Sequence, residues 1–248
     1  MYGWRGKLGL LIPANNTIIE PEMSKVLPEG AAAFATRMIV EGAFNSEALN
    51  RMETQASRGT GELALSQVDV IVYACMSTSL VKGKQWDCSF QERIQGQGVE
   101  LITAAQCTAK ALIELQAKNV AVLTPYPSTI QPLVAPYFQE WGLNPVALKS
   151  LDIDDYHAVT RVTPESLYRE ARAMGFKGAD ALCILATDLR TLEVIAPLEH
   201  DLGIPVVSTN LAIFWAFLDI LGLRDTGSAP DCALMDSLKK GLGIFQGG

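Results

Sequence analysis

The sequence predicts an α/β protein made of two similar parallel-sheet α/β halves, related by a pseudo-twofold, with an active site in the cleft between them. Three observations lead to this fold class. Short, continuous apolar runs alternate with longer amphipathic segments along the 248 residues, the runs of one half match those of the other, and polar residues follow the runs directly. Such alternation is typical of parallel sheets that helices cover on both faces.

Six apolar runs are expected to be buried strands, because each is continuous rather than alternating. They span residues 7–13, 68–75, 99–104, 119–125, 179–186 and 204–209. Helices are expected in the amphipathic segments, several of which begin at Ser or Thr and stop at Gly, as helix caps do. These segments span residues 46–66, 104–117, 128–142, 163–175 and 191–203.

The final apolar run, residues 211–223, contains Asp219 and is too short for a membrane span, so it is predicted to be a core helix. We therefore expect no contact with a membrane.

The chain repeats itself along its length. The run that ends at Pro13 matches the run that ends at Pro125, and the run that ends at Cys75 matches the run that ends at Ala186. Residues 98–104 match residues 203–209 in the same order. Three pairs at nearly constant spacing indicate a duplicated unit of small-domain size. We expect a first half of residues 1–105 plus 210–248, and a second half of residues 106–209.

Candidate site residues follow the strands, because ligands of open parallel sheets bind beyond the carboxyl ends of the strands. If the two halves face each other, these segments enclose one cleft, with position 75 and position 186 on opposite walls. The residues concerned are Pro13, Asn15, Asn16, Cys75, Met76, Ser77, Thr78, Tyr126, Ala186, Thr187 and Asp188.

Cys75 is the main candidate for chemistry. It ends a strand, and the Ser and Thr residues after it are good helix N-caps, so backbone N–H groups should lower the pKa of the thiol and favour a nucleophilic thiolate. The same amides suit a carboxylate or a developing oxyanion. A small, inert buried cysteine remains an alternative. Asn16 could simply shape a turn, and Tyr126, between two prolines, could be a packed ring.

The remaining thiols are weaker candidates. Cys183 is expected to pack within a strand and Cys107 within a helix, while Cys88 could reach the cleft from a neighbouring loop. The two histidines, His157 and His200, flank expected helices and are predicted to lie at the surface.

Composition narrows the function classes. A net charge of −7 and a pI near 4.9 argue against nucleic acid as a partner. Five widely spaced cysteines without a CxxC pair indicate reduced thiols in a cytoplasmic protein. With two histidines and no glycine-rich nucleotide motif, we expect neither a metal site of the usual imidazole or thiolate kind nor a nucleotide site.

Several motifs resemble one known superfamily over nearly the whole chain. They are GLLIPANNTIIEPEM, VYACMSTS, TPY and LRTLEVIAPLEHDLGIPVVSTNLAIFWAFL. Together they are similar to the aspartate/glutamate racemase superfamily, and within it to the branch of maleate cis-trans isomerases and arylmalonate decarboxylases. The resemblance implies a homo-oligomeric enzyme that needs no cofactor and holds a small carboxylate or dicarboxylate between two domains, with a cysteine on each side.

The resemblance also implies roles for individual residues. Cys75 would be the first catalytic cysteine, Asn16 the family asparagine and Tyr126 the family tyrosine. The substrate carboxylates would rest on backbone amides of the strand-end segments. The residues expected to bind substrate are Pro13, Asn15, Asn16, Met76, Ser77, Thr78, Tyr126, Tyr156, Thr187 and Asp188.

Two positions depart from the family pattern. Ala186 replaces the second catalytic cysteine, and Tyr156 stands where the isomerases carry a substrate-binding asparagine. An alanine cannot transfer a proton, which argues against two-base racemisation. The decarboxylases keep the second thiol and lack the first, which is the reverse of this chain. We therefore expect an isomerase of the maleate-to-fumarate type that adds the Cys75 thiolate covalently. The alternatives are a decarboxylase of a substituted malonate, and a carboxylate-binding relative with little turnover.

Overall fold

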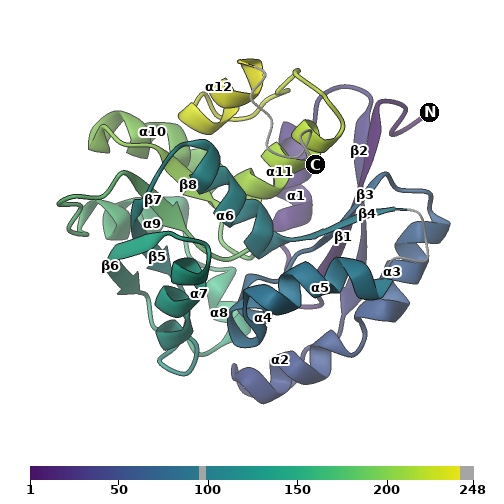
Figure 1. The fold of residues 1–248 in the computed structure, drawn as a ribbon, viewed down its shortest axis with the longest axis horizontal. Helices are drawn as coiled ribbons and strands as arrows, with labels where there is room; N and C mark the ends of the chain where they lie inside the picture. Colours follow the sequence, from purple (N-terminus) through teal and green to yellow (C-terminus); the bar gives the residue numbers. More distant parts are fainter. Residues whose placement is uncertain (95–98, 241–248) are drawn as a thin grey trace.

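The computed structural model describes residues 1–94 and 99–240, which form two four-stranded parallel sheets with helices packed around them (Figure 1). The first sheet has the order β2-β1-β3-β4 and the second the order β6-β5-β7-β8. The equivalent order confirms the predicted duplicated α/β fold. The strands are β1 (Gly6–Pro13), β2 (Ala31–Met38), β3 (Val70–Tyr73), β4 (Glu100–Thr103), β5 (Asn119–Thr124), β6 (Asn144–Ser150), β7 (Ala181–Ile184) and β8 (Val206–Ser208).

Helices connect the strands and cover the sheets. In chain order they are α1 (Ile19–Val26), α2 (Ser46–Glu53), α3 (Ala56–Leu65), α4 (Met76–Lys82), α5 (Lys84–Ile94), α6 (Ala104–Glu114), the 3₁₀ turn η1 (Gln131–Leu133), α7 (Val134–Glu140), α8 (Tyr156–Val159), α9 (Pro164–Arg172), α10 (Leu192–Leu202), α11 (Thr209–Ile220) and α12 (Ala233–Lys239). Within residues 1–94 and 99–240, no helix is long and apolar enough to cross a membrane.

Each of the six expected strands exists, but two further strands were not predicted. β2 and β6 each form an edge of their sheet. Exposed and partly buried residues alternate along β6, and β2 is also largely accessible, so neither has the continuous apolar run of a central strand. The start of one repeat segment, Gly98, and residues 241–248 of the expected first half lie outside the described residues.

Two expected helices are shorter than predicted. Residues 46–66 form α2 and α3, with Thr54 and Gln55 between them. Residues 128–142 begin with the turn η1 before α7, where Pro132 lies inside the turn. α1 was not predicted, and it has Pro21 in its first turn, where proline is tolerated. The apolar run near the C-terminus is α11, as expected, and its first eleven residues are buried.

The strand registers bring equivalent segments together. In the first sheet Leu11 pairs with Tyr73, and in the second Leu123 pairs with Ile184. The next residue of each chain segment continues the ladder: the N–H of Ala74 donates to Leu11, and the N–H of Leu185 donates to Leu123. The segments that follow β1 and β3 therefore leave the first sheet side by side, and those that follow β5 and β7 leave the second in the same way.

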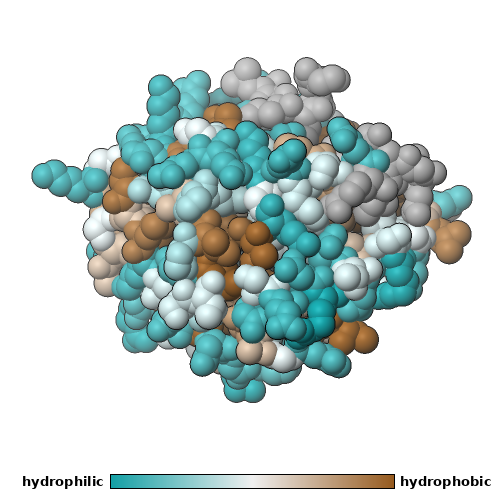
Figure 2. All heavy atoms as spheres, turned by 60° about the horizontal axis from the view of Figure 1, so that its bottom comes forward, coloured by the Kyte–Doolittle hydropathy of each residue, from teal (hydrophilic) through white to brown (hydrophobic). Residues whose placement is uncertain are grey.

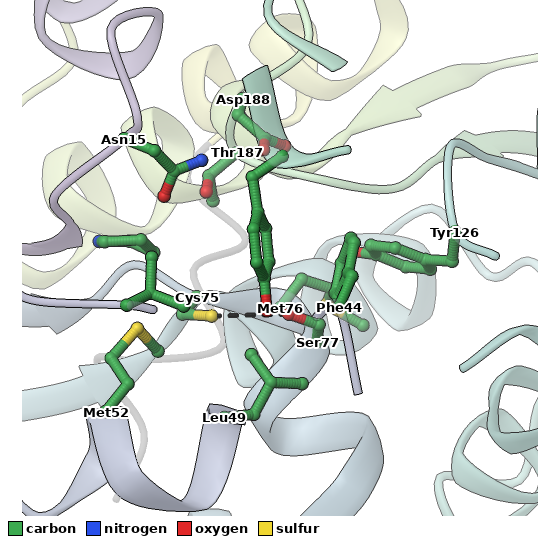
Figure 3. Close-up of a pocket in the computed structure, with 13 residues that line it drawn as sticks. Asn15, Phe44, Leu49, Met52, Cys75, Met76, Ser77, Tyr126, Thr187 and Asp188 are labelled. Carbon is green, nitrogen blue, oxygen red and sulfur yellow. Dashed lines mark hydrogen bonds between the residues drawn. The ribbon is translucent and has the colours of Figure 1, made fainter. Parts of the chain in front are cut away.

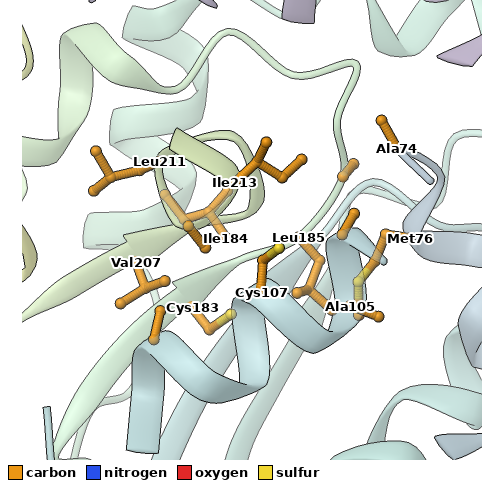
Figure 4. Packing of buried hydrophobic residues seen from close by; sticks show 14 of the residues in the cluster. Ala74, Met76, Ala105, Cys107, Cys183, Ile184, Leu185, Val207, Leu211 and Ile213 are labelled. Carbon is orange, nitrogen blue, oxygen red and sulfur yellow. The ribbon is translucent and has the colours of Figure 1, made fainter. Parts of the chain in front are cut away.

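A core shared by the two sheets holds them against each other. α6, which follows the first sheet, packs along α11, which follows the second. Figure 4 shows this region, where Cys107 of α6, Cys183 of β7 and Ile213 of α11 belong to one buried cluster. Both cysteines are fully buried, which confirms that they pack in the core. Both helices have side-chain N-caps, Thr103 for α6 and Ser208 for α11.

A buried carboxyl group also joins the two sheets. Glu22 of α1 is 4 % exposed, and its Oε1 accepts the backbone N–H groups of Thr191 and Leu192 at 2.7 and 3.1 Å. These N–H groups lie at the N-terminus of α10, where the helix dipole makes a negatively charged group favourable. Its Oε2 accepts the amide of Asn210 at 2.6 Å. Burial raises the pKa of Glu22, and these donors oppose the effect.

We predict that Glu22→Gln destabilises the fold by about 2 kcal/mol, because the amide can replace only part of the acceptor capacity and buried donors lose their partner. Urea denaturation of the full chain measures this. Glu29→Gln is the matched control at an exposed glutamate and should change stability by less than about 0.5 kcal/mol. Equal stability of the two variants would contradict the structural role given to Glu22.

Candidate active site

A cavity lies where the carboxyl ends of the two sheets face each other (Figure 3). Segments that follow β1, β2, β3, β5 and β7 line it, together with α2 and α8. Its lining residues are Pro13, Asn15, Val40, Phe44, Leu49, Met52, Cys75, Met76, Ser77, Tyr126, Tyr156, Thr187 and Asp188. Figure 2 shows apolar side chains gathered around a hollow on the face that comes forward from the lower part of Figure 1, where α2, α4 and α8 lie.

Cys75 lies between β3 and α4 and is only 4 % exposed. Its Sγ accepts the hydroxyl of Thr78 at 3.3 Å and lies 3.4 Å from the hydroxyl of Ser77. The hydroxyl of Tyr73 donates to Thr78 Oγ1 at 3.3 Å, which leaves the Thr78 proton directed at the sulfur. The thiol is therefore held between two hydroxyl groups, which would also stabilise a thiolate.

Burial nevertheless raises the pKa of the Cys75 thiol. Hydrogen bonds from Ser77 and Thr78 act in the opposite direction, and the charge of Asp188 adds to the increase. The expected lowering of this pKa is therefore wrong, because desolvation of the thiolate outweighs the donors at the start of α4.

The opposite side of the cavity follows β7. Ala186 is buried just behind the lining residues and has a φ of 110°, a conformation that costs energy for any residue except glycine. Its N–H donates to Thr209 Oγ1 at 3.2 Å. Thr187 Oγ1 donates to the carbonyl of Ala74 at 3.0 Å, which connects the two sheets at the residue before Cys75. Burial raises the pKa of Asp188 to about 6.

The two asparagines after β1 have different positions. Asn16 is buried behind the cavity lining, where its Oδ1 accepts the N–H groups of Ile18 and Ile19 and its amide donates to Thr187 Oγ1 at 3.0 Å. It thus shapes the turn into α1 and also supports Thr187. Asn15 lines the cavity, and its buried Oδ1 has no hydrogen-bond partner within residues 1–94 and 99–240.

An aromatic and apolar surface closes one end of the cavity. The rings of Phe44 and Tyr156 stack with centroids 4.4 Å apart, and Tyr126 meets Phe44 edge-on at 5.9 Å. The loop that carries Phe44 is held from the second sheet, since Thr129 Oγ1 donates to the Phe44 carbonyl at 3.0 Å and the Tyr156 hydroxyl to the Ala43 carbonyl at 3.3 Å. Burial raises the pKa of Tyr126 well above its usual value and that of Tyr156 to about 12.

Most of the residues expected in the site line this cavity, while Asn16, Thr78 and Ala186 lie directly behind it. Four lining residues were missed: Val40, Phe44, Leu49 and Met52. They belong to the segment after the edge strand β2. Candidate residues were those that follow a predicted strand, and β2 was not predicted. Their sequence signal would have been the apolar residues spaced through 40–52.

The other candidates lie away from the cavity. Cys88 is exposed on α5, and both His157 and His200 are exposed, as expected for the histidines. In the part of the chain that the structure describes, no group of three or more His, Cys, Asp or Glu residues could hold a metal ion.

Two parallel α/β sheets that enclose a thiol at a strand end define the class of racemase-like α/β enzymes. The family model of arylmalonate decarboxylase matches residues 8–232, and the chain belongs to this family. The resemblance to the branch of maleate isomerases and arylmalonate decarboxylases is thereby confirmed.

Maleate isomerases are among its relatives. The Pseudomonas putida enzyme is 28% identical over 232 residues, which cover 88% of this chain and 92% of the relative. The crystal structure of a P. putida maleate isomerase with a cysteine-to-alanine substitution, in complex with maleate, has a TM-score of 0.87 at 27% identity and covers 94% of this chain and 98% of that one.

A second solved structure is the maleate cis-trans isomerase of Nocardia farcinica. Its cysteine-to-serine mutant holds a covalently bound succinylcysteine intermediate. The TM-score is 0.86 at 26% identity, and the match covers 93% of this chain and 98% of that one. The two matches show that the fold of this chain is that of the maleate isomerases.

We predict that Thr78→Val slows alkylation of Cys75 by iodoacetamide at pH 8 by about three- to tenfold, because loss of one donor to the sulfur raises the pKa of the thiol further. Peptide mapping by mass spectrometry measures the rate. Alkylation of the exposed Cys88 in the same samples is the internal control and should stay constant. Unchanged alkylation of Cys75 would show that the Thr78 hydroxyl does not stabilise the thiolate.

Proposed function

We propose that the protein is a cofactor-independent isomerase that converts maleate, or a closely similar cis-dicarboxylate, into the trans form by covalent addition of the Cys75 thiolate. The observation that carries this proposal is the buried thiol of Cys75, held by Thr78 and Ser77 at the surface of a cavity between two sheets. The similarity to maleate isomerases over most of the chain supports the choice of substrate.

The reaction needs one bond to form and break. The thiolate of Cys75 adds to one alkene carbon, and the π electron pair moves to the neighbouring carbon and its carboxylate as an enediolate. The former double bond becomes single and rotates. The electron pair then returns, the C–S bond breaks, and the trans product leaves with the thiolate restored.

The cavity offers separate groups for the two carboxylates. Met76 and Ser77 line the cavity on the thiol side and Thr187 lines it on the other side, so we infer that their backbone N–H groups are the donors for the carboxylates. Donors at these positions would bind the developing negative charge more tightly in the transition state than in the substrate. The buried Oδ1 of Asn15 has no partner within residues 1–94 and 99–240, and as an acceptor it would pair with a hydroxyl or another donor of the substrate rather than with a carboxylate.

Absence of a second cysteine is compatible with this function. In two maleate isomerases, variants with one cysteine replaced hold maleate and a succinylcysteine intermediate. A site of this fold that lacks one thiol can thus still bind substrate or form the covalent adduct, and we infer the same for the site around Cys75.

A second candidate is decarboxylation of a substituted malonate. The observation that favours it is the apolar end of the cavity, where Phe44, Leu49, Met52 and Tyr156 would accept an aromatic or branched group better than a second carboxylate. In this reaction the carbanion left by CO₂ must be protonated inside the cavity.

We expect the wild-type protein to form fumarate from maleate and Cys75→Ala to form none, because alanine cannot make the covalent adduct. Proton NMR in deuterated water follows both compounds directly. A wild-type adduct of the maleate mass on the peptide that contains Cys75 would support the same step. Fumarate formed at equal rates by the two proteins would exclude covalent catalysis by Cys75.

Phenylmalonate tests the second candidate in separate samples of the wild type and Ala186→Cys. If decarboxylation is the function, phenylacetate with one deuterium should appear, and the added thiol should accelerate it by supplying the proton. Fumarate from maleate without phenylacetate from phenylmalonate would favour the isomerase. Phenylacetate as the main product would identify the protein as a decarboxylase instead.

A further inference from the structure

We propose that the carboxyl group of Asp188 carries the proton that this site exchanges with its substrate, on the side of the cavity opposite Cys75 and in place of the missing second thiol. The inference rests on the proposed function and deepens it, because it assigns the group that accepts the thiol proton and adds a step in which the enediolate carbon is protonated before the bond rotates and deprotonated afterwards.

The position of Asp188 is the first argument. It is the second residue after Ala186, and it lines the same cavity as Cys75. Figure 3 shows Asp188 beside Thr187 and Asn15, on the opposite side from Cys75, Met52 and Leu49. Burial is the main cause of the raised pKa values of Cys75, Tyr126 and Tyr156, and the charge of the Asp188 carboxylate adds to each of them from across the cavity.

Its neighbours on that side cannot carry a proton at neutral pH. Ala186 has no polar group, Asn15 has an amide, and the hydroxyl of Thr187 is already donated to the carbonyl of Ala74. The phenols of Tyr126, which follows β5, and of Tyr156 in α8 have pKa values that burial and the charge of Asp188 raise. Burial places the pKa of Asp188 at about 6, which suits a group that both accepts and releases protons near neutral pH.

Cys75 needs such a partner. Its thiol has a raised pKa, so at neutral pH the proton must be removed before the sulfur can attack. The thirteen residues that line the cavity include no Lys, Arg or His, and Asp188 is the only carboxylate among them. The carboxyl group of Glu22 in α1 is buried outside the cavity lining, and three N–H donors, from Thr191, Leu192 and Asn210, already occupy it.

Cys75 and Asp188 are the only protein groups that must gain or lose a proton in this reaction. In the free site Cys75 is a thiol and Asp188 a carboxylate. A water molecule in the cavity carries the proton from sulfur to the carboxylate on the opposite side. The S–C bond then forms as the π pair moves to the adjacent carbon, and the Asp188 carboxyl protonates that carbon. The product of this half is a succinyl thioether and an Asp188 carboxylate. After rotation, Asp188 removes one proton from the same carbon, the C–S bond breaks, and the proton returns to Cys75.

The pH dependence follows from the same balance. Below about pH 6 Asp188 is protonated and cannot accept the thiol proton, so kcat/KM of the wild type should fall as pH decreases through about 6. Asp188→Asn should lose this acidic limb. It should also lower kcat by about 10²- to 10⁴-fold, the range that a positioned acid or base contributes.

Restoring activity to Asp188→Asn with a second substitution distinguishes a chemical role of Asp188 from a structural one. Ala186→Cys added to Asp188→Asn should restore fumarate formation at least about tenfold, because a thiol again supplies a proton on that side. Asp231→Asn, the same change at an exposed aspartate away from the cavity, should leave kcat and the pH profile unchanged. Wild-type turnover in Asp188→Asn, or no rescue by the added thiol, would overturn the proposal.

Alkylation of Cys75 gives a readout that does not need turnover. Removing the Asp188 charge should lower the pKa of the thiol and increase the rate of alkylation by iodoacetamide at pH 8 severalfold, while Cys88 stays constant. If the wild type forms no fumarate, the isomerase proposal fails. The inference on Asp188 is then decided by the pH dependence of alkylation: a change of rate through about pH 6 in the wild type that is absent in Asp188→Asn supports it, and identical pH profiles overturn it.

Discussion

The site depends on a continuous set of buried hydrogen bonds that fixes one sheet against the other. Thr187 is its centre: its hydroxyl donates to the carbonyl before Cys75 and accepts the amide of Asn16, while its own carbonyl accepts the amide of Asn210. Glu22 holds the same Asn210 and the first N–H groups of α10. Because unpaired buried polar groups are costly, the two strand ends can occupy only a narrow range of separations. The cavity between Cys75 and Asp188 is the space that this separation leaves.

The protonation of the groups in the cavity depends on the absence of a positively charged side chain among the lining residues. No cation is present among the lining residues to favour a thiolate, so burial dominates over the two hydroxyl donors and Cys75 rests as a thiol. Burial acts in the same direction on Asp188 and raises its pKa to about 6, so this carboxyl can accept a proton near neutral pH. Burial thus keeps the Cys75 thiol protonated and also brings the pKa of Asp188 close to neutral pH. The donors around sulfur matter only once the proton has left.

The sequence was sufficient for the central strands and for the residues that follow them, since continuous apolar runs and a duplicated order are direct signals of buried parallel sheets. It failed at β2 and β6, because these two edge strands are half exposed and lack such runs, whereas the other two edge strands, β4 and β8, are mostly buried. That failure also hid Phe44 and Met52, which reach the cavity from the segment after β2. The predicted lowering of the Cys75 pKa was wrong for a different reason. The sequence shows the hydrogen-bond donors Ser77 and Thr78 at the helix start, but the burial of the thiol depends on how both sheets pack around it.

The packing of α6 along α11 has a consequence for how the chain reaches this structure. Domains generally fold as units during synthesis, from the N-terminus onward. α6 follows the first sheet directly, yet the helix that covers it is formed by Thr209–Ile220 and emerges only after all strands of the second sheet. A nascent chain that stops before residue 209 would leave the apolar face of α6 open to water or to a chaperone. Completion of the first sheet's core must therefore wait until the entire second sheet has been translated.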